Sequence, residues 1–126
     1  MKITEVIFPR ELIEGVLELA KGNHPREVFL LLRGEVNKHL VSIKEFIVPM
    51  NTTFGMGFSC FSPINLPVDF TILGSLHSHP SGSTNPSIED LHNFFGLIMV
   101  IIAYPYDTSS IAAYDKSGER LKVRII

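Results

Sequence analysis

The chain has 126 residues, of which 45% are hydrophobic and 19% are charged, so we expect a single domain with a substantial apolar core over residues 1–126. This composition excludes a disordered chain and a collagen-like repeat, and a single cysteine excludes an internal disulfide. The formal net charge of -2 argues against a nucleic-acid-binding protein, which usually carries a strong basic excess.

The sequence also argues against a membrane protein. We find no apolar run with a small-residue cleavage site at the N-terminus, so we expect a cytoplasmic protein without a signal peptide. The longest apolar stretch, Phe94 to Tyr104, is interrupted by Gly96 and is shorter than the roughly 20 residues that span a bilayer. The mean hydropathy of +0.25 is high for a small soluble domain and is compatible with a homodimer.

The first elements of the chain alternate between strand and helix patterns. Ile3 to Phe8 predicts a short strand, and Pro9 suits the first turn of a helix that Gly22-Asn23 ends. The apolar face of this helix has helical spacing and consists of Leu12, Ile13, Val16, Leu17 and Ala20. Two further strands are expected at Val28 to Leu32 and Leu40 to Val48.

The second half repeats this alternation after a long loop at residues 51–67. A second helix is expected from Ser87 to Phe95, with Ser87 as its N-cap. Strands are expected at Phe70–Leu76, Leu97–Tyr104, Ser110–Tyr114 and Leu121–Ile126, the last two forming a hairpin. The pattern predicts an α/β domain with a mixed, curved β-sheet flanked by two main helices.

One segment carries residues suited to metal chemistry. His77 and His79 are two apart at the end of a strand, so their side chains share a face and can converge on one ion. Ser87 and Asp90 are three apart on a helix and also share a face, which makes Asp90 a candidate third ligand. Two histidines and one carboxylate leave a fourth position for water, as in catalytic zinc sites.

Each half of this pattern has a plainer interpretation. Ser87-x-x-Asp90 before an apolar run resembles a capping box, with Asp in place of the usual Glu or Gln. Isolated histidines such as His24, His39 and His92 are usually ordinary surface or core residues. The two halves together, joined by a short Gly/Pro-rich loop, favour a metal site.

The segment His77-Ser78-His79-Pro80, six residues and then Ser87-x-x-Asp90 resembles the JAMM motif of MPN-domain zinc metalloproteases. These proteins also carry an acidic residue just before a buried strand. The stretch from Pro25 to Gly34, which contains Glu27, is similar, except that Leu30 stands where Gly is common in the family.

The resemblance implies a role for each matching residue. His77, His79 and Asp90 would ligate one Zn²⁺ per chain. Glu27 would hydrogen-bond the zinc water, act as general base and pass the proton to the leaving amine. Ser87 would donate a hydrogen bond to the oxyanion of the tetrahedral intermediate.

Active members of this family cut isopeptide bonds after the Gly-Gly end of ubiquitin or ubiquitin-like proteins, so conjugates of such modifiers are the expected substrates. Two alternatives remain: a hydrolase that trims a residue or tail from a ubiquitin-fold sulfur-carrier protein, and a metal-free MPN scaffold. By residue type alone, Glu35 and Glu45 compete with Glu27 for the role of the base.

The loop before the motif strand generates a first testable prediction. Phe54, Met56 and Phe58 would line a groove for the extended substrate tail. Replacing each by Ala should then raise KM or lower kcat/KM without changing the melting temperature or the zinc content. If these side chains only pack in the core, a Phe→Ala change should instead cost about 3–5 kcal/mol of stability. Measuring both quantities on the same variants separates the two.

Overall fold

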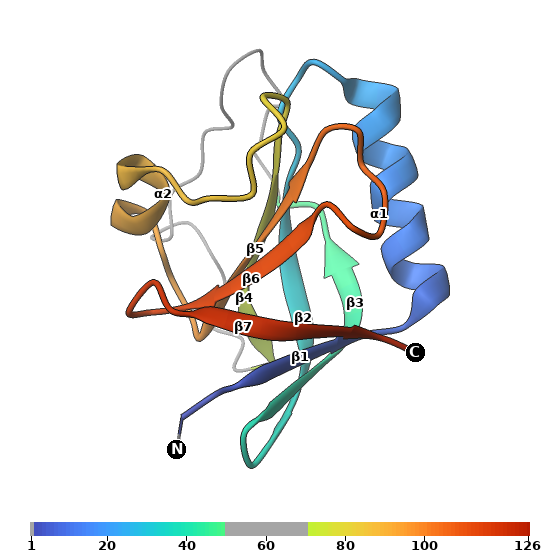
Figure 1. The fold of residues 1–126 in the computed structure, drawn as a ribbon. Coiled ribbons are helices and arrows are strands. Elements are labelled where there is room, and N and C mark those ends of the chain that lie inside the picture. Colours follow the sequence, from blue (N-terminus) through green and yellow to red (C-terminus); the bar gives the residue numbers. More distant parts are fainter. Residues whose placement is uncertain (1, 50–70) are drawn as a thin grey trace.

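The computed structural model describes residues 2–49 and 71–126, and these contain seven strands and two helices (Figure 1). In chain order the elements are β1 (Glu5–Phe8), α1 (Arg10–Asn23), β2 (Phe29–Asn37), β3 (Leu40–Ile47), β4 (Ile72–His79), α2 (Ile88–His92), β5 (Ile98–Ala103), β6 (Ile111–Asp115) and β7 (Arg120–Ile125). The predicted order of elements is confirmed for this part of the chain.

The strands form a closed barrel in the order β1-β3-β2-β4-β5-β6-β7. The expected mixture of parallel and antiparallel pairs is present, because β4 runs parallel to β5 and antiparallel to β2. The expectation of a curved sheet was incomplete, since β1 pairs in parallel with both β3 and β7 and so closes the sheet. Val6, for example, lies opposite Val41 on one side and Val123 on the other.

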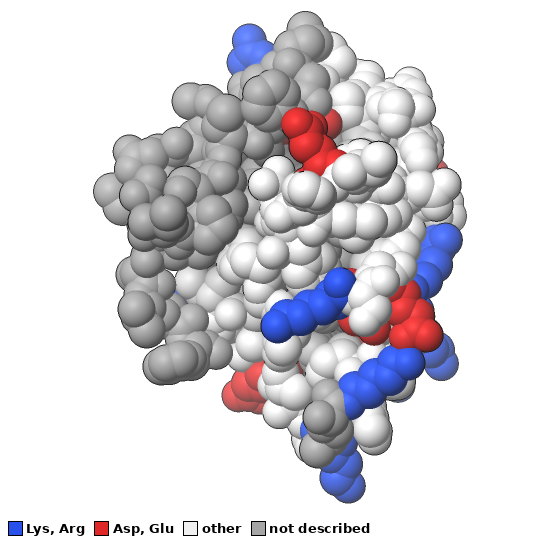
Figure 2. Space-filling view, turned by 90° about the vertical axis from the view of Figure 1, so that its left-hand side faces the viewer, with Lys and Arg blue, Asp and Glu red and all other residues white. Residues whose placement is uncertain are grey.

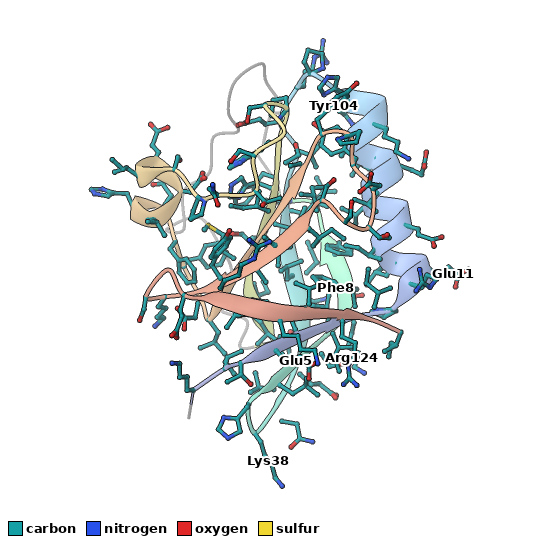
Figure 3. The ribbon with its side chains drawn as sticks, viewed as in Figure 1. Glu5, Phe8, Glu11, Lys38, Tyr104 and Arg124 are labelled. Carbon is teal, nitrogen blue, oxygen red and sulfur yellow. The ribbon has the colours of Figure 1, made fainter. Side chains whose placement is uncertain are left out.

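Helix α1 lies along one side of the barrel, while α2 lies on the opposite side (Figure 1). The predicted apolar face of α1 is buried against the barrel through Ile13, Val16, Leu17 and Ala20. Glu11 points away from the barrel, whereas Phe8 at the end of β1 lies within it (Figure 3). Neither described helix combines the length and apolar character needed to cross a membrane.

Helix α2 is shorter than expected: it covers Ile88–His92 rather than extending to Phe95. Asn93 caps its C-terminus, and Gly96 then adopts a φ of +76°, a left-handed conformation that glycine tolerates best. This turn brings the Leu97 N–H within 2.7 Å of the Leu73 carbonyl oxygen, which places β5 directly beside β4. The parallel pairing of these two strands therefore ends the helix early.

Strand β4 has two differently packed faces. Leu76 belongs to the main core inside the barrel, together with Leu30 and Val100 on the neighbouring strands. His77 lies on the opposite face, where its neighbour Ile101 belongs to a smaller apolar cluster with Met99, Ala112, Tyr114 and Phe94. The period of two along a strand therefore directs the histidines toward the side of the barrel that carries α2.

Two glycines provide a matched test of this packing. A Cβ added at Gly74 in β4 would lie 1.9 Å from the Ile98 carbonyl oxygen, whereas one added at Gly15 in α1 meets nothing within 4 Å. Gly74→Ala should therefore destabilise the fold by at least about 1–3 kcal/mol. Gly15→Ala should stabilise it by about 0.5–1 kcal/mol, because alanine favours a helix interior. Denaturant unfolding of both variants checks the pair, and equal effects would contradict the strand packing.

Candidate metal centre

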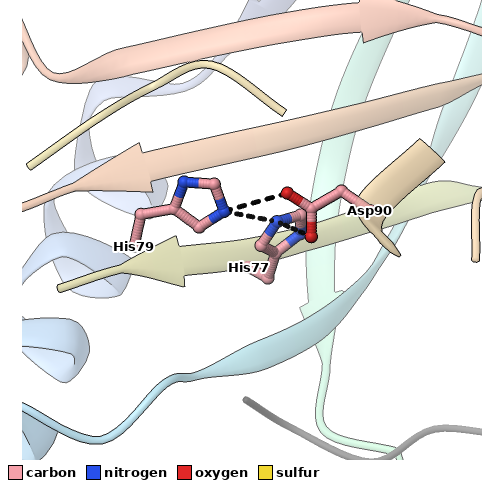
Figure 4. A group of neighbouring side chains, drawn as sticks. All are labelled: His77, His79 and Asp90. Carbon is pink, nitrogen blue, oxygen red and sulfur yellow. Dashed lines mark hydrogen bonds and ion pairs between the residues drawn. The ribbon is translucent and has the colours of Figure 1, made fainter. Parts of the chain in front are cut away.

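The ends of β4 and α2 bring together three side chains that could hold a metal ion: His77, His79 and Asp90 (Figure 4). The Nε2 atoms of the two histidines lie 3.1 Å apart. The Asp90 carboxylate places Oδ1 3.1 Å from His77 Nε2 and Oδ2 3.1 Å from His79 Nε2. The side chains are 10%, 12% and 17% exposed, so the group is largely shielded from solvent.

The capping-box interpretation of Ser87 and Asp90 is confirmed, and it coexists with the cluster. The Asp90 N–H donates to Ser87 Oγ at 3.0 Å, and the Ser87 N–H donates to Asp90 Oδ2 at 2.8 Å. The cap holds the carboxylate in one orientation, with its oxygens directed at the histidines. The local signal for a helix N-terminus therefore also positions the third candidate ligand.

The spacing of these atoms suits a zinc ion. Two ligands bound to tetrahedral zinc at about 2.0–2.1 Å are roughly 3.3 Å apart. The two Nε2 atoms are 3.1 Å apart, and each lies 3.1 Å from a different oxygen of the Asp90 carboxylate, distances close to that value. Two imidazole nitrogens and one carboxylate are also a donor set that zinc prefers in catalytic sites. The group therefore fits one zinc ion per chain.

The loop between the two halves of the motif orients His79. Its Nδ1 lies 2.8 Å from the Ser83 carbonyl oxygen, which places the ring proton on Nδ1 and leaves the Nε2 lone pair for a metal. Burial lowers the pKa of His79, but hydrogen bonds with Asp90 and Ser83 outweigh burial and raise it overall. The sequence did not predict this contact of Ser83, because a hydrogen bond accepted by a backbone carbonyl does not depend on residue type.

Asp90 is held in its charged form. Partial burial would raise its pKa, but hydrogen bonds with His77 and His79 outweigh burial and lower it far below the ordinary value for aspartate. The Ser87 amide contributes in the same direction. An ionised carboxylate beside two imidazoles is the charge state that a divalent cation requires.

Glu27 lies next to this group. It is two positions before the first residue of β2, Phe29, and β2 runs antiparallel to β4 with Phe29 opposite His77. The Ser78 N–H donates to the Val28 carbonyl oxygen at 3.0 Å, so the next position, Glu27, lies across from His79. The charge of Glu27 contributes to the raised pKa of His79, which indicates that the carboxylate is near the ring.

The two competing glutamates lie elsewhere. Glu35 pairs with Ser42 near the far end of β2. Glu45 in β3 forms an ion pair with Arg33, whose partner in β4 is Ile72, at the end of that strand remote from His79. Of the three glutamates proposed as the base, only Glu27 is placed beside the candidate metal ligands.

Ser87 lies at the rim of the group. Its hydroxyl oxygen accepts the Asp90 N–H, which leaves its own O–H proton available for donation. Ser87 is exposed to solvent, so a substrate could reach it. The predicted groove residues Phe54, Met56 and Phe58 lie outside the described residues, and their role stays a prediction.

Comparison with known proteins supports the resemblance seen in the motif. A family described as prokaryotic homologs of the JAB domain matches residues 9–115, a span that includes Glu27 and the three candidate ligands. The chain belongs to the JAB (JAMM/MPN) family. A relative in Haloferax volcanii, described as a probable metalloprotease, is 33% identical over 115 residues, covering 85% of this chain and 71% of the relative.

Solved structures of the family have the same fold. A JAB1/MPN domain protein from Archaeoglobus fulgidus superposes with a TM-score of 0.68 at 34% identity, covering 100% of this chain and 99% of the other. A structure described as a JAMM metalloprotease-like zinc site in the proteasome and signalosome gives a TM-score of 0.67 at 30% identity, with the same coverage. A Desulfitobacterium hafniense protein at 18% identity shares the fold, with a TM-score of 0.71 over 96% of this chain and 92% of the other.

The geometry predicts that three residues bind zinc jointly. His77→Ala, His79→Ala or Asp90→Ala should each reduce the zinc content from about one ion per chain toward zero, since two remaining ligands bind weakly. Elemental analysis after dialysis measures the content. His92→Ala is the matched control, because His92 lies on the same helix as Asp90 but is exposed and outside the group. Full zinc content in all three ligand variants would contradict the site.

Proposed function

We propose that the protein is a zinc-dependent isopeptidase that hydrolyses the bond between the C-terminal Gly-Gly of a ubiquitin-like modifier and an amine of a target protein. The single observation that carries this proposal is the convergence of His77, His79 and Asp90 on one point beside Glu27. The family membership and the probable metalloprotease relative support hydrolysis of an amide bond.

The residues divide the reaction between them. Zinc, when bound, acts as a Lewis acid that polarises the scissile carbonyl and makes water more acidic. Glu27 takes a proton from the attacking water and gives it to the leaving amine nitrogen as the C–N bond breaks. Ser87 donates its O–H to the carbonyl oxygen as negative charge develops there. Water supplies the hydroxyl of the new carboxyl group, and its other proton reaches the leaving amine through Glu27.

The surface beside the site is compatible with a polypeptide substrate. On the face that carries α2, the described surface is largely uncharged, and charged side chains of both signs gather toward its lower end (Figure 2). Two apolar residues one helical turn apart on α2 are exposed, Ile88 at 81% and Leu91 at 43%. An apolar rim next to the candidate ligands would favour a protein surface over a small charged substrate.

The substrate class is tested with two defined substrates. One carries an isopeptide bond between a Gly-Gly terminus and a lysine, and the other is a ubiquitin-fold sulfur carrier with a C-terminal extension. We expect mass spectrometry to show release of the intact Gly-Gly terminus from the first, and a zinc chelator to abolish it. Cleavage of the second alone would favour the trimming hydrolase, and cleavage of neither would favour the scaffold.

The assignment of the base gives a separate prediction. Glu27→Gln should keep the zinc content and the melting temperature but lower kcat by at least about 100- to 10,000-fold, because proton transfer by a positioned base contributes that much. Glu35→Gln is the matched control, since Glu35 lies on β2 at a distance from the ligands. If kcat falls in Glu35→Gln but not in Glu27→Gln, the base is Glu35 and the assignment to Glu27 is wrong.

A further inference from the structure

A buried tyrosine lies in the connection between β5 and β6, close in space to the end of β4. Tyr106 is only 1% exposed, and its φ of +63° is unusual for a bulky residue. The turn that holds it is attached to β4, because the Tyr104 N–H donates to the His79 carbonyl oxygen at 3.1 Å. The surrounding structure therefore holds Tyr106 in a left-handed backbone conformation that is unfavourable for a tyrosine.

The Tyr106 hydroxyl belongs to a continuous chain of hydrogen bonds. The Val28 N–H donates to Ser78 Oγ at 2.8 Å, and the Ser78 hydroxyl bonds to the Tyr106 oxygen. The Tyr106 oxygen in turn lies 3.1 Å from His24 Nδ1. If each hydroxyl passes its proton onward, every group in the chain is satisfied, with His24 as the final acceptor.

This series of hydrogen bonds reaches the backbone on both sides of Glu27. His24 lies three positions before Glu27 and Val28 one position after it. Glu27 itself belongs to no helix or strand, since β2 begins at Phe29. Burial raises the pKa of Tyr106, and the nearby charge of Glu27 raises it further, which places the carboxylate and the phenol in the same neighbourhood.

The same series of hydrogen bonds also reaches β4, the strand that carries two of the candidate ligands. Ser78 is fully buried and lies between His77 and His79, with its side chain on the opposite face of β4. Its hydroxyl links the Tyr106 turn to the Glu27 segment, and its backbone N–H bonds to Val28 as well. Ser78 thus bonds to the segment that bears Glu27 through both its hydroxyl and its backbone N–H.

We propose that Tyr106 is a positioning residue that fixes the Glu27 segment against β4 through the Ser78 hydroxyl. This inference rests on the proposed function, because it treats Glu27 as the base. The competing role is packing alone: the Tyr106 ring also contacts His24 and Tyr104, with centroids 5.6 Å and 5.9 Å away. Tyr106→Phe removes the hydroxyl and keeps the ring, so it separates the two roles.

Kinetics in two backgrounds test whether Tyr106 acts through Glu27. In the zinc-loaded wild-type protein, Tyr106→Phe should lower kcat about 10- to 100-fold, the cost of misplacing a catalytic group by about an ångström, and should change KM less than about twofold. In the Glu27→Gln background the same substitution should cost less than about twofold, because the group that it positions is already gone. An equal loss in both backgrounds, or no loss in the wild type, would overturn the proposal.

Three further variants test whether the effect runs through Ser78 or through the aromatic packing. Ser78→Ala interrupts the chain at its centre and should reproduce the kcat loss of Tyr106→Phe, and the double variant should lose no more than about twofold beyond either single variant. Tyr104→Phe is the matched control, since Tyr104 belongs to the same aromatic cluster but is half exposed. A loss in Tyr104→Phe as large as in Tyr106→Phe would assign the effect to the aromatic packing.

Hydrogen exchange provides a readout that needs no substrate. In the zinc-loaded protein, Tyr106→Phe and Ser78→Ala should speed exchange of the Val28 amide at least about tenfold, while Tyr104→Phe leaves it unchanged. Unchanged exchange in both chain variants would overturn the proposal. The two proposals can fail separately. If the wild-type protein cleaves neither substrate, the proposed function is wrong. If Tyr106→Phe still speeds exchange of the Val28 amide in that case, the positioning of this segment by Tyr106 is supported.

Discussion

The Asp90 carboxylate is the group on which the site depends. It accepts the Ser87 N–H at the start of α2 and lies 3.1 Å from the Nε2 atoms of both histidines. One carboxylate therefore caps the helix through Oδ2 and completes the set of candidate ligands through both oxygens. Because α2 has only five residues and buries none of them, this cap and the loop before it locate the helix more than packing does.

The period of two along β4 separates the chemistry from the core. Leu76 and Ser78 face the barrel interior, while His77 faces the cluster around Met99 and Ile101. The main core can thus remain apolar while the next residue in sequence takes part in a polar site. Ser78 is the exception on the inner face, and its hydroxyl is satisfied by Val28 and Tyr106 rather than left without a partner.

Local patterns predicted what depends on neighbours in sequence. Helix α1, the β6–β7 hairpin and the Ser87 cap were all predictable, because their periodicity, turn residues and capping signals lie within a few positions. The spacing of His77, His79, Ser87 and Asp90 also predicted the cluster, since strand and helix geometry place such residues on shared faces. The proposed role of Glu27 rests on the resemblance to the family, because nothing in the local sequence distinguishes it from Glu35.

What could not be predicted depends on distant pairing. Barrel closure joins Glu5 to Lys122, and the shortening of α2 follows from the parallel pairing of β4 with β5. The Tyr106–Ser78–Val28 chain joins three separate segments through one buried serine. The partners in these contacts are too far apart in sequence to fall within one window of about 11–18 residues, so periodicity cannot predict them.

The position of Glu27 outside any regular element shows how this fold combines precision with accessibility. A residue inside β2 would be held by ladder hydrogen bonds, but its side chain would be confined to one face of the sheet. Glu27 is two positions before the strand, where its backbone lies outside that ladder and its segment needs other anchors. The bonds of Val28 to Ser78, and of His24 to Tyr106, provide such anchors on both sides. The carboxylate can therefore lie across from His79, at the open end of the strands, while its segment stays attached to the same strand that carries the histidines.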